Sequence, residues 1–168
     1  FGVEPLLTFL ADYAAPPKRR LAFDAKKASL EVEPGHDRFT GFIFKIQANM
    51  NPRHRDRVAF MRVVSGKFKR GMDVVVGASG KALRLSNPHT FMAQERSIVD
   101  EAWPGDIVGL YDPGNLRIGE TLCVGDPIQF DGIPRFAPEH FMRVVLKDPL
   151  KRKQLDQGLQ QLSGEGVI

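Results

Sequence analysis

The sequence predicts a mainly β fold, a small closed β-barrel with a flanking N-terminal helix and a C-terminal α+β unit of one strand and one helix. Between residues 39 and 130, short runs rich in β-branched and aromatic residues recur with Gly and Pro turns between them. Outside that region, leucines at three-to-four spacing are typical of amphipathic helices. No run approaches the roughly 18 uninterrupted apolar residues of a transmembrane helix. A chain of 168 residues can build such a core without metal or disulfide.

The first element is a predicted helix over residues 4–13. Pro5 suits the first helical turn, where its missing N–H costs nothing. An apolar stripe follows, made of Leu6, Leu7, Leu10 and Tyr13. Such a short helix is unstable alone in water, so it must pack on something. Residues 15–35 are expected to be a linker, because Pro16 and Pro17 stiffen the chain, with room for an edge strand at 28–32.

The central feature is residues 39–71, where two predicted strands flank a basic loop. Residues 39–49 alternate with the period of a strand that has one face on a core. One face carries Thr40, Phe42, Phe44, Ile46 and Ala48, and the other carries Gly41, Ile43, Lys45 and Gln47. Residues 58–65 form the second strand. Further strands are predicted at residues 67–69, 72–76, 81–85, 91–93, 97–101, 107–111 and 118–123.

Two turns with Pro second and Gly third are predicted at residues 103–106 and 112–115. Trp103 lies in the first of them, where we expect it to plug an end of the barrel rather than stack on a base. From residue 133 the pattern changes to a strand at 141–146 and a helix capped by Asp148 with Pro149 at its first position. This strand–helix unit looks truncated, and the chain is expected to be a fragment.

Charge points to a polyanionic partner. The net charge is +4 and the pI about 9.4. Between residues 53 and 70 there are seven Lys or Arg and one acid, Asp56. Smaller basic groups lie at residues 18–20 and 147–153. For these two groups an ordinary solvated surface is an equally good interpretation.

No catalytic, cofactor-binding or metal-binding residue is predicted. The sequence contains neither a phosphate-binding loop nor a dinucleotide fingerprint. The four histidines stand singly, without a second ligand at metal spacing. Cys123 is expected to be a packed strand residue, and a single cysteine fits a reducing compartment. The basic loop is therefore the one candidate site.

Several long strings resemble a known family, the translational GTPases. Their second domain is similar to two stretches of this chain. The first is RVAFMRVVSG followed by GM, and the second is AWPGDIVGL followed by IGETL. KIQANMNPRHRDRVAFMR, GIPRFAPE and LKDPLKRKQL favour the branch of bacterial peptide chain release factor 3 over elongation factor G. The resemblance covers nearly the whole chain.

The resemblance implies a domain plan and a function. Residues 1–14 would be the last helix of a GTPase domain, 15–35 a linker, 36–130 the β-barrel second domain and 133–168 the start of an α+β third domain. The complete factor would bind GTP or GDP with Mg²⁺, hydrolyse GTP in the cytoplasm as a monomer, and promote release of class I release factors from the ribosome. This chain would be its ribosome-docking region, against small-subunit ribosomal RNA (rRNA). The candidate rRNA contacts are Arg53, His54, Arg55, Arg57, Lys67, Lys69 and Arg70.

Two other hypotheses remain open. A stand-alone β-barrel could bind single-stranded nucleic acid by stacking, which needs surface aromatic residues among the basic ones. Phe42, Phe44 and Phe60 lie on strands, and their period suggests that most of them face a core. An enzyme built from residues set aside above is the third hypothesis; no GTP hydrolysis is expected from this fragment.

Overall fold

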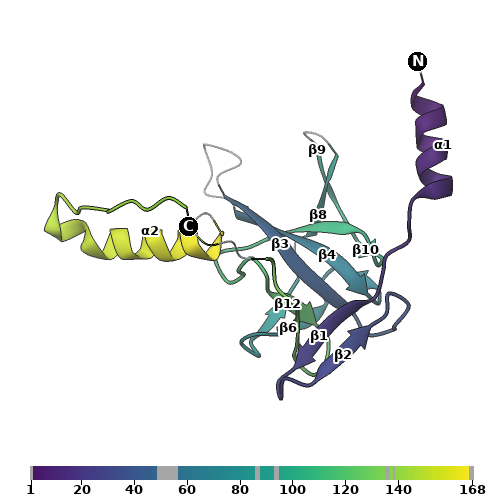
Figure 1. Ribbon diagram of the computed structural model, residues 1–168, viewed down its shortest axis with the longest axis horizontal. Helices are drawn as coiled ribbons and strands as arrows, with labels where there is room; N and C mark the ends of the chain where they lie inside the picture. Colours follow the sequence, from purple (N-terminus) through teal and green to yellow (C-terminus); the bar gives the residue numbers. More distant parts are fainter. Residues whose placement is uncertain are drawn as a thin grey trace.

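The computed structural model describes residues 2–48, 57–85, 88–92, 95–134, 137 and 139–166, and its main body is an eight-stranded antiparallel sheet (Figure 1). In spatial order the strands are β7 (Ala82–Arg84), β6 (Asp73–Val76), β12 (Thr121–Cys123), β3 (Thr40–Ala48), β4 (Arg57–Ser65), β11 (Ile107–Tyr111), β8 (Pro88–Met92) and β9 (Glu95–Ile98). β3, β4, β6 and β11 lie where they were predicted, whereas β8 and β9 each begin two or three residues earlier than predicted. The mainly β class is confirmed.

The sheet curls around one apolar core. Its largest fully buried side chains include Phe68, Ile43, Met61 and Leu116. A two-stranded pair, β5 (Phe68–Lys69) with β10 (Glu101–Ala102), connects the chain after β4 to the chain before β11. Among the described residues, no ladder joins the end strands β7 and β9. The structure is therefore a curled, barrel-like sheet, and the continuous ring of a closed barrel is not seen in this part of the chain.

A β-bulge in β3 changes which side chains face the core. Ile43 is paired with Met61, but the next pair is Lys45 with Phe60, so Phe44 is the extra residue. Beyond the bulge the alternation shifts by one position, and Ile43 and Ile46 both join the core. The prediction that one uninterrupted alternation runs along this strand is wrong. Phe44, which it grouped with Ile46, lies half-buried outside the core instead.

The expected linker contains two strands. β1 (Arg20–Asp24) pairs on one side with β2 (Ser29–Val32) and on the other with β13 (Ile128–Phe130). This small sheet buries its own cluster against the outside of the barrel. The cluster consists of Ala22, Val32, Val64, Cys123, Ile128 and Phe130. The edge strand expected at 28–32 is confirmed by β2. The linker prediction is wrong over β1, because the partner β13 lies about a hundred residues later and no local pattern announces it.

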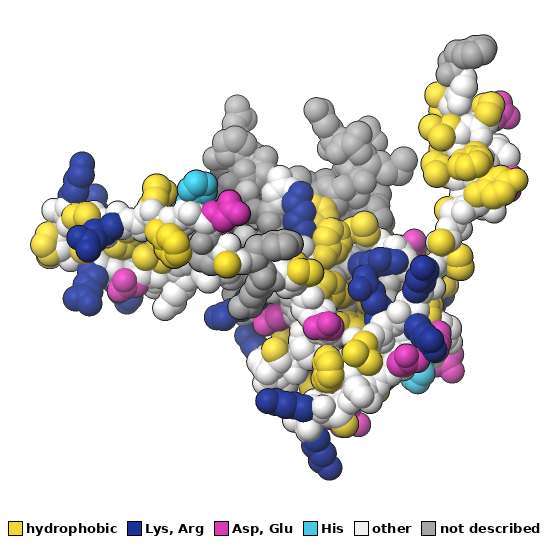
Figure 2. Space-filling model, viewed as in Figure 1, with side chains coloured by type: hydrophobic (Ala, Val, Ile, Leu, Met, Phe, Trp, Pro, Cys, Tyr) yellow, Lys and Arg dark blue, Asp and Glu magenta, His cyan; other side chains and the backbone are white. Residues whose placement is uncertain are grey.

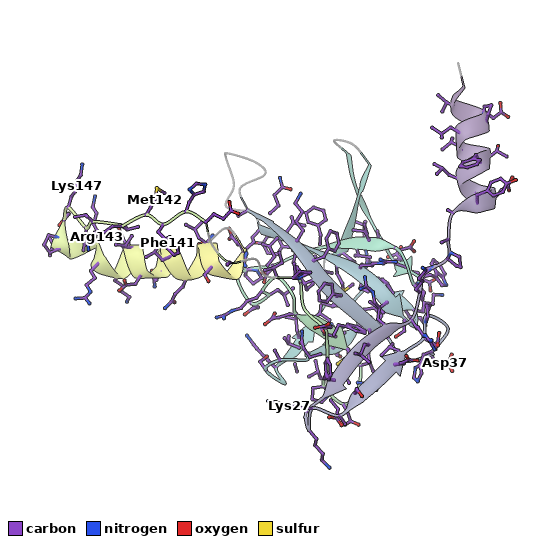
Figure 3. All side chains as sticks on the ribbon, in the orientation of Figure 1. Lys27, Asp37, Phe141, Met142, Arg143 and Lys147 are labelled. Atoms are coloured by element: carbon purple, nitrogen blue, oxygen red, sulfur yellow. The ribbon has the colours of Figure 1, made fainter. Side chains whose placement is uncertain are left out.

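The β1–β2 hairpin has Lys27 at its turn, labelled in Figure 3. Its backbone there is left-handed, with φ 62°. Cys123 is buried in the strand cluster, with Sγ 3.6 Å from the carbonyl oxygen of Val75. This confirms the prediction that Cys123 is a packed strand residue.

The type II turn predicted at residues 103–106 is present. The amide of Asp106 donates to the carbonyl of Trp103 at 2.9 Å, and Gly105 has φ 101°. The turn lies against β4, since the amide of Gly105 donates to the carbonyl of Val63 at 2.9 Å.

The N-terminal helix forms as predicted, as α1 (Val3–Tyr13). It extends away from the barrel in Figure 1, and none of its side chains is buried. The packing partner that such a short helix was expected to need is therefore not found among the described residues.

The C-terminal unit forms only in part. Asp148 caps a short 3₁₀ turn, η1 (Pro149–Lys151), by accepting from the amide of Leu150 at 3.0 Å, and α2 (Arg152–Gly164) follows. The strand predicted at 141–146 is wrong: the described residues there are extended without a ladder. A strand needs a neighbour to pair its backbone, and this segment finds none, so Phe141 and Met142 are almost fully exposed (Figure 3).

Candidate nucleic-acid interface

The basic loop joins β3 to β4 at one end of the barrel. Ala48 pairs with Arg57 at the last step of the β3–β4 ladder, so both ends of the loop start side by side. Arg53, His54 and Arg55, the core of the predicted rRNA contact group, lie outside the described residues. Their contact with rRNA stays a prediction.

Arg57 has a different position from the one expected. Its side chain is 11% exposed and forms ion pairs with Asp112 at 3.2 Å and with Glu165 at 3.4 Å. A third contact is a hydrogen bond to the carbonyl of Leu116 at 2.9 Å. These contacts occupy the guanidinium within the protein and leave it little surface for phosphate.

Asp112 is the centre of this buried group. One carboxylate oxygen accepts hydrogen bonds from the amides of Gly114, Asn115 and Leu116, at 3.0, 2.7 and 3.2 Å. The turn predicted at residues 112–115 provides those amides, and Gly114 has φ 110°. A buried carboxylate with three N–H donors and one guanidinium is fully compensated. Sequence reasoning assigned no role to Asp112 or Glu165, and only the Asp-Pro-Gly turn hinted at the first.

The second predicted contact group lies at the β5–β10 pair. Lys67 forms an ion pair with Glu101 at 2.6 Å, and Arg70 one with Asp100 at 3.4 Å. Lys69 is exposed and has no ion pair with a described residue. Exposed ion pairs contribute little free energy, so Lys67 and Arg70 could exchange their partners for phosphate at low cost. The local charge is nevertheless balanced, which the run of basic residues did not suggest.

Trp103 does not plug the barrel. Its ring is 52% exposed, and the ammonium of Lys67 lies 4.9 Å from its centroid. The prediction of a buried plug is wrong, because the turn that holds Trp103 points it outward beside β5 and β10.

A cleft of about 680 Å³ lies between the barrel and α2. Barrel side chains on its wall include Arg57, Asp112 and Arg117, and α2 contributes Gln157, Gln160 and Gln161. The wall is thus polar, with neither a Cys nor a His on it. In the described part of the chain, no group of three or more His, Cys, Asp or Glu residues could hold a metal ion. The geometry is that of a joint between two parts of a protein.

Comparison with known proteins now adds to this geometry. Residues 38–125 match the family model described as Elongation factor G domain 2, which spans more than half of the chain. The chain belongs to this family of translation-factor domains. The match runs from the start of β3 past the end of β12 and so covers most of the curled sheet.

Two further findings extend the match. Residues 130–168 match the model described as Class II release factor RF3, C-terminal domain. Over its full 168 residues, the chain is 55% identical to the peptide chain release factor 3 of Symbiobacterium thermophilum. It spans 31% of the length of that protein. The resemblance to bacterial release factor 3 is thus confirmed.

A solved structure supports the fold. A crystal structure of a Thermus thermophilus protein superposes with a TM-score of 0.62 over 98% of this chain and 23% of that one, at 22% identity.

No helix among the described residues is long and apolar enough to cross a membrane.

Proposed function

We propose that this chain is the ribosome-docking middle region of a translation-termination factor. The observation that carries the proposal is the 55% identity to a peptide chain release factor 3 over every residue of the chain. The match runs through the loop and the segments on both sides of it, so a shared role is more economical than a new one for the same surface.

The complete protein would bind and hydrolyse GTP with Mg²⁺ through residues other than those of this chain. It would use that cycle to release class I release factors from the ribosome in the cytoplasm. In this proposal the barrel binds the ribosome and orients the factor on it, and GTP hydrolysis takes place at the nucleotide site.

The proposed contact surface is the basic loop. Arg53, His54 and Arg55 form its first group, and Lys67, Lys69 and Arg70 its second. Arg57 stabilises the base of the loop and does not contact phosphate, since its guanidinium is paired with Asp112 and Glu165. Arginine in the first group suits phosphate because its planar fork binds two oxygens at once.

Ribosome binding at several salt concentrations tests the proposal. In the intact protein, Arg53→Ala with Arg55→Ala should weaken binding and lower the log–log salt slope by up to about 0.9 for each lost phosphate contact. A matched control, Lys26→Gln with Lys153→Gln, removes two exposed charges elsewhere and should leave the slope unchanged. Equal slopes for the double variant and the unmodified protein would reject the loop as the docking surface.

A further inference from the structure

A small hollow on the outside of the barrel has a chemistry that the basic loop does not explain. It has a volume of about 170 Å³ and lies where β1 passes the outer face of β3 and β4. Its lining is Arg20, Leu21, Phe42, Arg62, Val64, Phe130 and Asp131. It is smaller than a typical pocket for a drug-sized ligand and suits a single small planar or apolar group.

The floor of the hollow is apolar and partly aromatic. Phe42 meets Phe130 edge to face, with ring centroids 6.4 Å apart and an interplanar angle of 83°. Phe130 and Val64 are buried beneath, while Phe42 is half-buried and keeps part of its ring accessible. The surface aromatic residue that stacking would require is therefore present, although the strand alternation assigned it to a core.

Two arginines flank this floor. Arg62 lies opposite Phe42 on β3 and opposite Ile107 on β11, so its side chain rises between two apolar neighbours on the outer face. Arg20 begins β1 on the other side and is exposed. Figure 2 shows Lys and Arg side chains gathered beside hydrophobic ones where β1 begins.

Neither of these guanidiniums is held by an acid or a carbonyl in the part of the chain that the structure describes. Neither Arg20 nor Arg62 has an ion pair or side-chain hydrogen bond with the described residues, whereas Arg19 pairs with Glu31 at 2.9 Å. Asp131 is the one acid in the lining, and its carboxylate accepts from the amide of Gly132 at 3.0 Å. Two unpaired cations beside an apolar hollow complement an anion attached to a flat group.

We propose that this hollow binds one nucleotide of single-stranded RNA. The base would stack against Phe42, and the adjoining phosphates would lie on the guanidiniums of Arg20 and Arg62. Stacking on aromatic rings and arginine planes, with phosphate contacts around it, is how proteins hold unpaired bases. The inference rests on the proposed docking on rRNA and names a second contact away from the basic loop.

The strand arrangement favours RNA over an acidic peptide. Bound extended peptides commonly add to an exposed sheet edge through their backbone. β1, β3 and β4, which carry most of the lining, each have paired strands on both sides and offer no such edge. The end strand β13 contributes only Phe130 to the lining. A nucleotide needs no backbone ladder, only the ring and the two cations.

The test is anisotropy titration of a fluorescein-labelled single-stranded RNA decamer with the intact protein. Arg20→Gln with Arg62→Gln should weaken binding tenfold or more and lower the salt slope by about 0.7 for each lost contact. Phe42→Leu keeps an apolar side chain and should weaken binding roughly fivefold without changing the slope. The charge-matched control, Lys26→Gln with Lys153→Gln, should bind as the unmodified protein does. Unchanged affinity in the Arg20/Arg62 variant would overturn the inference.

Cross-linking locates the contact independently of any variant's stability. RNA carrying 4-thiouridine should cross-link to the peptides that contain Phe42 or Phe130, and cross-links confined to residues 49–56 would contradict the hollow. An Asp- and Glu-rich peptide that binds at the hollow in place of RNA would also overturn the proposal.

The Arg53→Ala/Arg55→Ala variant separates this inference from the proposed function. If ribosome binding falls in that variant and not in the Arg20/Arg62 variant, the docking role stands and the hollow is rejected. If neither variant binds more weakly, both proposals fail. A loss in each, with urea midpoints unchanged, supports two separate contacts.

Discussion

Arg57 is the residue at which sequence and structure diverge most. Its position in a run of arginines indicated a phosphate contact, and its side chain instead pairs with Asp112 and Glu165. The difference arises because Arg57 is the first residue of β4, and the strand holds the backbone of Arg57 beside Asp112. The amide of Asp112 donates to the carbonyl of Arg57 at 2.9 Å. Arg53 and Arg55 lie outside the described residues, and their contact with phosphate stays a prediction.

The first prediction concerns this buried pair. Asp112→Ala should destabilise the protein by about 3–5 kcal/mol, because Arg57 and three backbone amides lose their acceptor in a buried site. Urea unfolding followed by circular dichroism measures the loss. Asp37→Ala, an exposed acid labelled in Figure 3, is the control and should change stability little. Equal midpoints for the two variants would show that Asp112 does not stabilise the fold in this way.

The second prediction concerns pH and Glu120. Burial raises the pKa of this carboxyl above its usual value of 4.5, against the hydrogen bond and charge of Arg117, which lower it. The folded protein therefore holds its proton to higher pH than the unfolded chain does. Stability falls as pH rises from the unfolded pKa through the folded one, and this contribution is constant above that window.

Glu120→Gln removes this ionisable group and retains an oxygen that can accept from the amide of Arg117. The urea midpoint of the variant, relative to the unmodified protein, should therefore rise as pH increases from about 4 to 7. Midpoints measured across that range check the sign. A relative midpoint that falls with pH would mean that the folded protein lowers the pKa of Glu120.

At the scale of elements, the strands were predictable and their neighbours were not. Alternation and turn residues placed β3, β4, β6 and β11 within a residue or two of their observed bounds. The bulge in β3 left no such signal, because one extra residue shifts the alternation without changing its composition. β1 was missed because it is short and one of its two partners, β13, lies far along the chain.

The third prediction tests how β13 packs on the end of β6. A methyl group added to Gly77 would lie 1.9 Å from the carbonyl oxygen of Ile128, so the backbone must move. Gly77→Ala should lower the free energy of unfolding by about 1–3 kcal/mol through overpacking. Gly35→Ala, where no atom lies within 4 Å of the new methyl, is the matched control and should be nearly neutral. A Gly77→Ala protein as stable as the control would exclude this close contact.

At the scale of the whole molecule, the barrel and α2 are joined at one point. Glu165, just after α2, reaches Arg57 on β4 at 3.4 Å, and the amide of Ile118 donates to the carbonyl of Gly164 at 3.1 Å. Gln157, Gln160 and Gln161 of α2 line the polar cleft of about 680 Å³. The helix extends away from the barrel in Figure 1. The Arg57–Glu165 ion pair and the Ile118–Gly164 hydrogen bond therefore hold the two parts in alignment.

The fourth prediction follows from that joint. Glu165→Ala should broaden the distribution of distances between spin labels at Lys26→Cys on the barrel side and Lys153→Cys on α2. Electron–electron double resonance measures this distribution. Cys123 is buried and should therefore stay unlabelled. Asp156→Ala on the exposed face of α2 is the control and should leave the distribution unchanged. A distribution equally narrow in both variants would show that Glu165 does not set the alignment.

The sequence by itself determined the mainly β class, most strands, the two helices with the Asp148 cap, and the family. These properties are local, since alternation, caps and long motif strings can be recognised from neighbouring residues. Only the tertiary structure decided that Arg57 is internal, that Trp103 is exposed, and that Phe42 and two unpaired arginines share a hollow. Those outcomes depend on which distant strands pair and in what register. A bulge, or a pairing partner far along the chain such as β13, changes them, and neighbouring residues do not reveal it.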